Sequence, residues 1–285
     1  MFAILSKLGV YVILRLTALF FGDESGASAN FGELVLQYGG LATIVFGTVG
    51  VLASQGVARI ACFSVLVSSG TTLAVIGYGD AGATAGALYY LVSSTLALAC
   101  LFLLIELMER GRSAGDDVLA ITLEAYGDDE DLMHEQEVGV ATPGAFATLG
   151  AAFICCAILI AGMPPLSGFL GKFAIISAML DLGAEGGVPA GAWALIGVLI
   201  VSGLAATVAL MRHGINTFWV SLDGVLPAIR SVEAAAIVLL LGLGILMTVF
   251  AQPVMAYMSM AADTVYARGE YLATVLSNAS LGGQP

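Results

Sequence analysis

The chain has 285 residues, of which 59% are apolar and only 11% are charged, and its formal net charge is −12. Soluble domains carry about 25% charged residues, so this composition excludes a soluble globular domain and indicates a membrane protein. Many of the acidic residues lie between Asp116 and Glu137, so the net charge describes one segment. The chain shows no basic patch of the kind that indicates binding to nucleic acid.

Apolar runs long enough to cross a bilayer recur along the whole chain. A spanning helix needs about 20 mostly apolar residues, whereas a β-barrel would show alternating segments of about 10 residues. The runs here are long and continuous, so we expect an all-α, polytopic membrane protein with about seven transmembrane helices. We do not expect a signal peptide, because Lys7 and Arg15 interrupt the first run. The expected spans are 2–21, 36–54, 58–79, 83–109, 144–182, 190–211 and 231–255.

The first span carries a basic stripe. Lys7, Tyr11 and Arg15 are spaced four residues apart, so we expect them to share one face of the helix. At 1.5 Å per residue, Lys7 and Arg15 lie about 12 Å apart along the axis, which places Arg15 well inside the membrane or at its far interface. Lys7 is open to two interpretations, because it is either part of a proton pathway or an ordinary anchor at the cytoplasmic surface.

The third and fourth spans carry hydroxyl side chains near their middles. In membrane helices such groups bond to their own backbone or hold helices together, and they also line chains of water molecules. We treat four of them as candidate members of a proton pathway. In the same region Glu106 precedes Arg110 by four residues, a helical ion pair that we interpret as structural. The four hydroxyl candidates are Ser64, Ser68, Ser93 and Ser94.

Two polar segments lie outside the spans. The segment 113–143 is acidic and poor in aromatic residues, so we expect a solvated loop with at most a short surface helix. The segment 256–285 mixes tyrosine, alanine and charge, and we expect a polar tail along the membrane interface. The cysteines lie inside apolar runs and the histidines have no ligand partner at a suitable spacing, so we expect no metal site and no cofactor.

The fifth expected span, 144–182, is about twice as long as a bilayer requires. Its middle reads Gly-Met-Pro-Pro-Leu-Ser-Gly, and the two prolines remove two backbone donors. The span is therefore either two separate helices or one crossing that is broken in mid-membrane. The residues of the expected break are Gly162, Pro164, Pro165, Gly168 and Gly171.

The placement of positive charges decides between these alternatives, because Lys and Arg favour the cytoplasmic side. If 144–182 crosses the membrane once, one side holds the arginines near the helix ends and the opposite loops hold no Lys or Arg. Two crossings would blur this distribution. We therefore expect one net crossing per span, an N-terminus inside, a cytoplasmic segment 113–143, and external loops at 22–35, 80–82 and 183–189.

Lys172 lies four residues after Gly168, deep in an apolar run. A lysine inside a membrane helix costs a few kcal/mol even on lenient scales, so such residues mark functional sites. Burial favours the neutral amine, so a lysine at this depth is able to take up and release a proton. The alternatives are a side chain that reaches outward to the surface, and a break that is only a kink in a packed bundle.

Several stretches of the sequence resemble one family. The runs 7–15, 59–64 and 162–173 occur in the order found in the proton-translocating antiporter-like subunits that multisubunit Mrp/Pha cation/proton antiporters share with respiratory complex I. The region 87–112 and the run 212–219 are most similar to the D subunit of the Mrp/Pha type. The resemblance covers essentially the whole chain.

The resemblance implies that a full-length member has about fourteen helices with two inverted five-helix repeats. This chain would begin at the eighth helix. The glutamate and the lysine that act in the first repeat have no counterpart here, so we expect a fragment or one part of a split subunit. The implied units are a flanking helix 1–21, a five-helix repeat 36–211, a final helix 231–255 and the tail 256–285.

The resemblance also implies roles for single residues. Lys172 would be the buried lysine of the second broken helix, and Lys7 would belong to the proton pathway. Many relatives carry a histidine where this chain has Ser94. A serine does not hold a proton at neutral pH, so a relay at this position must pass through water and hydroxyl groups.

The implied function is that of a transporter subunit and not of an enzyme. It would be a multi-pass protein of the bacterial inner membrane that works with other membrane subunits to exchange a monovalent cation for protons. The expected cation is Na+. One alternative is a proton-pumping membrane subunit of a complex I (NADH-quinone oxidoreductase) or hydrogenase-type assembly. The other is a fragment without transport of its own.

Overall fold

A computed structural model describes residues 2–22, 28–125, 143–183, 187–218, 231–267 and 269. In these residues all regular structure is helical, and six helices are long and apolar enough to cross a membrane. The expected all-α, polytopic membrane fold is confirmed. The helices are α1 (Phe2–Phe21), α2 (Glu33–Ala53), α3 (Val57–Ile76), α4 (Ala81–Ala125), α5 (Pro143–Ala161), α6 (Ser167–Asp181), α7 (Ala190–Phe218), α8 (Ser231–Val249) and α9 (Ala251–Tyr266).

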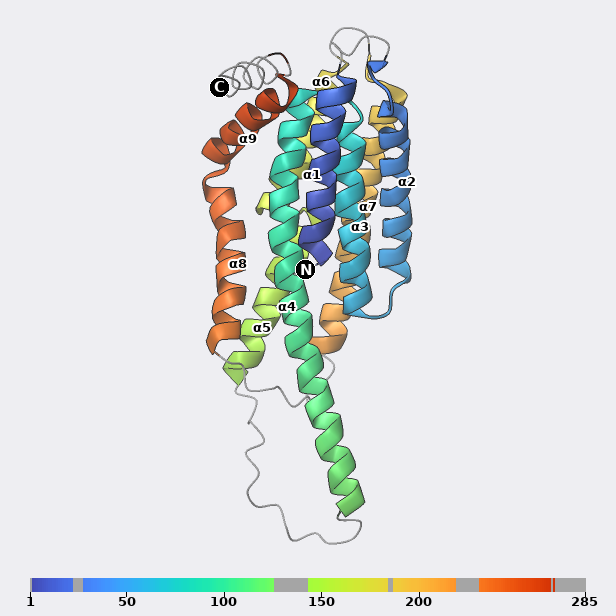
Figure 1. Ribbon diagram of the computed structural model, residues 1–285. Helices are drawn as coiled ribbons and strands as arrows, with labels where there is room; N and C mark the ends of the chain where they lie inside the picture. The colour runs from blue at the N-terminus through green and yellow to red at the C-terminus, as the bar shows by residue number, and fades with distance from the viewer. Residues whose placement is uncertain are drawn as a thin grey trace, which may run out of the picture.

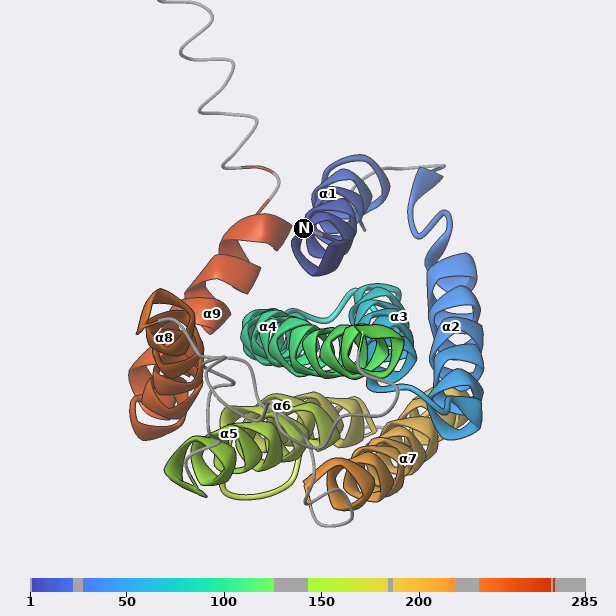
Figure 2. The same ribbon diagram turned by 90° about the horizontal axis from the view of Figure 1, so that it is seen from below.

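Two helices form the centre of the bundle. Figure 2 shows α3 and α4 in the middle, with α1, α2, α7, the α5–α6 pair and the α8–α9 pair around them. The helices α1 to α4, the α5–α6 pair, α7 and the α8–α9 pair run in alternate directions along the bundle axis (Figure 1). The helices α5 and α6 follow each other along this axis and together make one crossing, so the single broken crossing within 144–182 is confirmed.

Glycines let α6 lie directly against α4. A Cβ atom at Gly171 of α6 would stand 2.9 Å from Cα of Tyr90 in α4, and one at Gly86 of α4 would stand 2.9 Å from the backbone nitrogen of Ile175 in α6. Small residues at such contacts are a common means of helix association in membranes, where lipid tails leave no hydrophobic driving force between helices. This contact places the second half of the broken crossing beside the N-terminal part of α4.

Two expected boundaries are corrected. The helix α4 continues to Ala125 and extends beyond the bundle (Figure 1), so the first part of the expected loop 113–143 is helical. Residues 126–142 lie outside the described residues. The expected last span, 231–255, consists of α8 and α9, and the first part of the expected tail, 256–266, belongs to α9. Pro253 explains this interruption, because it has no N–H to donate to the carbonyl of Val249.

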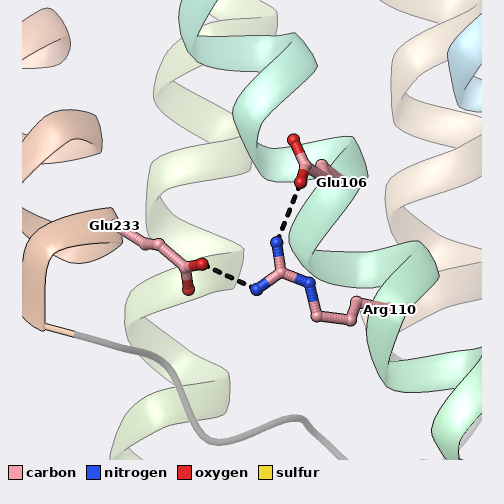
Figure 3. A network of polar contacts seen from close by, with 3 residues as sticks. All are labelled: Glu106, Arg110 and Glu233. Atoms are coloured by element: carbon pink, nitrogen blue, oxygen red, sulfur yellow. Dashed lines mark hydrogen bonds and ion pairs between the residues drawn. The ribbon is translucent and has the colours of Figure 1, made fainter.

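An ion-pair network fixes the start of α8 to α4. Arg110 donates through Nη2 to Glu106 at 2.8 Å and through Nη1 to Glu233 at 2.6 Å (Figure 3). The predicted pair of Glu106 and Arg110 is thus confirmed, and Glu233 joins it from the first turn of α8, where negative charge is favourable. Because the side chains of Arg110 and Glu106 are 44% and 66% exposed, the network positions α8 but contributes little stability.

Candidate functional site

A small polar cavity lies in the middle of the bundle, beside the broken crossing. Its volume is about 20 Å³, which is room for at least one water molecule. Residues of α2, α3, α4, α5, α6 and α7 line it, so it lies where most of the bundle converges. Its polar lining consists of Ser64, Ser68, Tyr90, Ser94, Lys172 and Ser202.

Lys172 is buried in this cavity, with only 7% of its surface exposed. Its Nζ donates a hydrogen bond to the backbone carbonyl of Ala161 at 2.9 Å. Ala161 is the last residue of α5, and the last carbonyls of a helix have no following helical donor. They also form the negative end of the helix dipole, which favours a cation. The broken crossing therefore supplies the acceptor that holds the Lys172 ammonium group.

Two glycines make room for the Lys172 side chain. Gly162 directly follows α5, and a Cβ atom there would stand 2.7 Å from Cδ of Lys172. Gly203 lies in α7, and a Cβ atom there would stand 3.3 Å from Nζ of Lys172. A side chain at either position would press on the lysine. Lys172 thus reaches the end of α5 because both neighbours lack side chains.

The break itself follows from local chemistry. Gly162 has a φ of 73°, a left-handed conformation that glycine adopts without steric cost and that ends α5. Pro164 and Pro165 supply no backbone donors, so the helix does not resume until Ser167. A Cβ atom at Gly168 would collide with the carbonyl oxygen of Leu159, so only glycine lets the two halves lie this close together.

A serine pair fixes the start of α6. The hydroxyl of Ser167, the first residue of α6, lies 2.8 Å from the hydroxyl of Ser93 in α4, and both residues are fully buried. In a membrane interior no water satisfies the polar groups that a break exposes, so neighbouring helices must do so. Ser93, which we expected in a proton pathway, is thus placed at the break and does not line the cavity.

Lys7 reaches the cavity through Ser68. Lys7 is 3% exposed, and its Nζ donates to Oγ of Ser68 at 2.6 Å. Ser68 lines the cavity and in turn donates to the carbonyl of Val65 at 3.0 Å. Lys172 lines the same cavity directly. No carboxylate is present among the described residues that line it.

The expected basic stripe of α1 divides between two environments. Tyr11 is 43% exposed, Arg15 is half-buried, and neither lines the cavity. Residues four apart on a helix share a face only approximately, and contact with α3 and α4 decides which of them turns inward. The buried stripe of α1 consists of Lys7, Val10, Leu14 and Ala18.

The serines combine both of the roles that we considered for hydroxyl groups. Ser64 donates to the carbonyl of Ile60 at 2.8 Å, and Ser94 donates to that of Leu91 at 3.1 Å, so each bonds to its own helix. Both also line the cavity and present oxygen acceptors to it. Ser202 of α7 joins them without having been predicted, because its only signal is a hydroxyl beside Gly203 in an apolar run.

The chain is similar in sequence to a described family and to curated proteins. A family model described as NADH:quinone oxidoreductase/Mrp antiporter, TM, matches residues 1–200. The chain is 51% identical to the D subunit of a probable K(+)/H(+) antiporter of Rhizobium meliloti, over 99% of this chain and 53% of that protein. It is 30% identical to the D subunit of the Na(+)/H(+) antiporter of Bacillus subtilis, over 96% of this chain and 50% of that protein.

Solved structures show the same fold. The Mrp complex from Dietzia sp. DQ12-45-1b contains a chain that matches with a TM-score of 0.67 at 20% identity, over 96% of this chain and 55% of that one. Respiratory complex I from Thermus thermophilus with bound NADH contains a chain that matches with a TM-score of 0.60 at 20% identity, over 92% of this chain and 51% of that one. The chain spans about half the length of the curated relatives it matches.

Proposed function

We propose a function for this chain on the basis that it belongs to the NADH:quinone oxidoreductase/Mrp antiporter transmembrane family. It is a membrane subunit of a multisubunit antiporter that exchanges a monovalent cation for protons. Its contribution is a proton path between Lys7 and Lys172. The relatives named above are described as K(+)/H(+) and Na(+)/H(+) antiporter subunits, so both cations are candidates. Its partners are other membrane subunits of the same complex.

One observation carries this proposal: the buried Lys172 lines a small cavity, the buried Lys7 contacts it through Ser68, and no carboxylate among the described residues lines it. Each ammonium group costs free energy in a membrane interior, and in the described part of the chain neither is paired with an acid that would offset this cost. A structural bundle gains nothing from such an arrangement. A path that must hold a proton and then release it requires groups that exist in both the charged and the neutral form.

The geometry suggests how Lys172 passes on its proton. The charged ammonium group is attracted to the negative end of α5 and donates to the carbonyl of Ala161. A neutral amine lacks this electrostatic attraction and is free to turn toward the cavity. The hydroxyls of Ser64, Ser68 and Ser94, together with water, then connect it to Lys7. Ser94 holds no charge, so it serves here as a donor and acceptor only.

Substitution of Lys172 tests the proposal in membranes that contain the complete complex. Cation-dependent proton movement is followed with a pH-sensitive dye in everted vesicles after addition of K+ or Na+. Lys172→Ala and Lys172→Arg are both expected to lose at least about tenfold in rate per assembled complex, because a guanidinium group does not release its proton in the working pH range. Lys172→Glu is expected to keep partial activity, since a buried carboxyl group also titrates near neutrality.

The neighbouring Phe173 provides a matched control, because it is 57% exposed on the outside of the bundle. Phe173→Leu is expected to leave the rate unchanged. Normal antiport per complex in Lys172→Arg would refute the switching role and leave Lys172 as a structural cation. Proton movement that needs NADH oxidation and no added cation would instead favour the pump of a complex I-like assembly, whose fold this chain shares.

A further inference from the structure

A second cavity lies at the end of the bundle that the charge distribution assigns to the outside. Its volume is about 40 Å³. The last turns of α1 form one side of its wall, and the start of α2 with the residues just before it forms another. The end of α3 with the following turn, and the last residue of α9, complete the wall. The polar residues in this wall are Thr17, Asn30, Glu33 and Tyr266.

Two carboxylates, Glu33 and Asp80, lie in or beside the wall of this cavity. The Glu33 carboxylate lies beside Gly79, where a Cβ atom would stand 3.4 Å from Oε1. The Tyr266 hydroxyl lies 3.0 Å from Oγ1 of Thr84, and both Glu33 and Asp80 are close enough to act on it electrostatically. The loops 22–35, 80–82 and 183–189 contain no Lys or Arg. A cleft with this charge raises the local concentration of cations, including hydrated protons.

An apolar cluster separates this cavity from the Lys7 site. The buried residues Val10, Leu14 and Ile76 form its centre, with partly buried leucines of α2, α3 and α4 packed around them. Leu14 and Ile76 also line the outer cavity. Ile76 follows Ser68 by eight residues, which is about 12 Å along α3. The seam between α1 and α3 therefore holds a lysine site in the middle, an apolar section, and an acidic cavity at its outer end.

We propose that the outer cavity is an external vestibule for protons on their way to or from Lys7, and that the apolar cluster is the seal between them. Apolar constrictions block ions and protons while they are dry and conduct once water enters. The Glu33 carboxylate holds the hydrated proton in the vestibule, and among the described residues Tyr266 lines the same cavity while Asp80 acts electrostatically on Tyr266. This inference rests on one part of the proposed function, namely that Lys7 takes up and releases protons.

A polar side chain within the seal tests this inference. The complete complex is reconstituted into proteoliposomes, a pH gradient is imposed without a cation gradient, and its passive decay is measured. Leu14→Asn is expected to speed the decay at least tenfold. Leu16→Asn is the control, because Leu16 lies on the same helix but is 47% exposed. Should Leu14→Asn fail to assemble, Ile76→Ala, which only thins the seal, is expected to raise the leak several-fold.

A carboxylate substitution tests the vestibule separately. Adding Glu33→Gln to the leaky variant is expected to reduce its leak several-fold. An unchanged leak in the double variant would overturn the role of Glu33, and assembled variants of Leu14 and Ile76 that are as tight as the parent would overturn the seal. Passive decay needs no antiport, so the two proposals can fail separately. A parent complex without cation exchange would refute the proposed function, and a Leu14→Asn leak in that complex would still support the seal and the vestibule.

Discussion

Replacing Gly162 by alanine tests whether Lys172 must be seated against the end of α5. Gly162 has a φ of 73°, where a residue with a Cβ atom costs about 1–2 kcal/mol. The added Cβ atom would also stand 2.7 Å from Cδ and 3.0 Å from Cε of Lys172. Carbon atoms prefer separations of about 3.5–4.0 Å, so the lysine must move away from the carbonyl of Ala161.

The expected effect has two separate parts. The backbone cost lowers the stability of the folded subunit by about 1–2 kcal/mol. The second part is the hydrogen bond from Lys172 to Ala161, and a bond that involves a charged group contributes about 1.5–3 kcal/mol. Since about 1.4 kcal/mol corresponds to a tenfold change, the seated geometry becomes roughly 10- to 100-fold less populated. The rate per complex falls in proportion if turnover passes through this geometry.

Gly32 provides a matched control for the backbone cost. It has a φ of 88°, and a Cβ atom there would meet nothing within 4 Å. Gly32→Ala and Gly162→Ala are both expected to lower the thermal unfolding midpoint of the purified complex by a few degrees. Only Gly162→Ala is expected to lose cation-dependent proton flux per assembled complex. Equal flux per complex in the two variants would refute the reasoning, because it would show that turnover does not require the seated lysine.

Three further predictions concern stability and topology. Tyr89→Phe removes a donor 2.8 Å from a carbonyl in the last turn of α8, so we expect a loss of about 1 kcal/mol in the unfolding free energy and an unchanged flux per complex. Glu233→Gln removes the charge from one of the two ion pairs of Arg110, and we expect a loss below about 1 kcal/mol in the unfolding free energy that shrinks as salt rises; a large loss at high salt would contradict this. Single cysteines at Ser25 and Ser113, in a background without native cysteines, are expected to be labelled from opposite sides, and labelling of both from one side would contradict the topology.

The number of crossings was predictable because two physical constraints determine it. A bilayer limits how many residues one helix needs, and arginines gather on one side of it. The structure places Arg59 at the start of α3, Arg110 in the second half of α4 and Arg212 near the end of α7, and these parts of the three helices lie toward the same end of the bundle. This arrangement requires α5 and α6 to count as one crossing. The sidedness of the bundle itself stays a prediction.

Other features were missed because the sequence signal was weak or depended on packing. Pro253 divides the last expected span by the same chemistry as Pro164 and Pro165, but the span has an ordinary length, so we did not predict a break there. The inward turn of Lys7 and the outward turn of Tyr11 depend on how α1 rotates against its neighbours, which helical spacing does not determine. Ser202 is a single hydroxyl in an apolar helix, and only the fold shows that it meets the cavity.

The position of α4 explains why both interruptions are tolerated in a membrane. Backbone and side-chain polar groups at a break need partners, since lipid offers none. Within one turn of α4, Tyr89 donates to the carbonyl of Met247 near the end of α8, and Ser93 meets Ser167 at the start of α6. The next residue, Ser94, lines the polar cavity. Because α4 contacts both interruptions and also lines the cavity, a shift of this helix changes all three together.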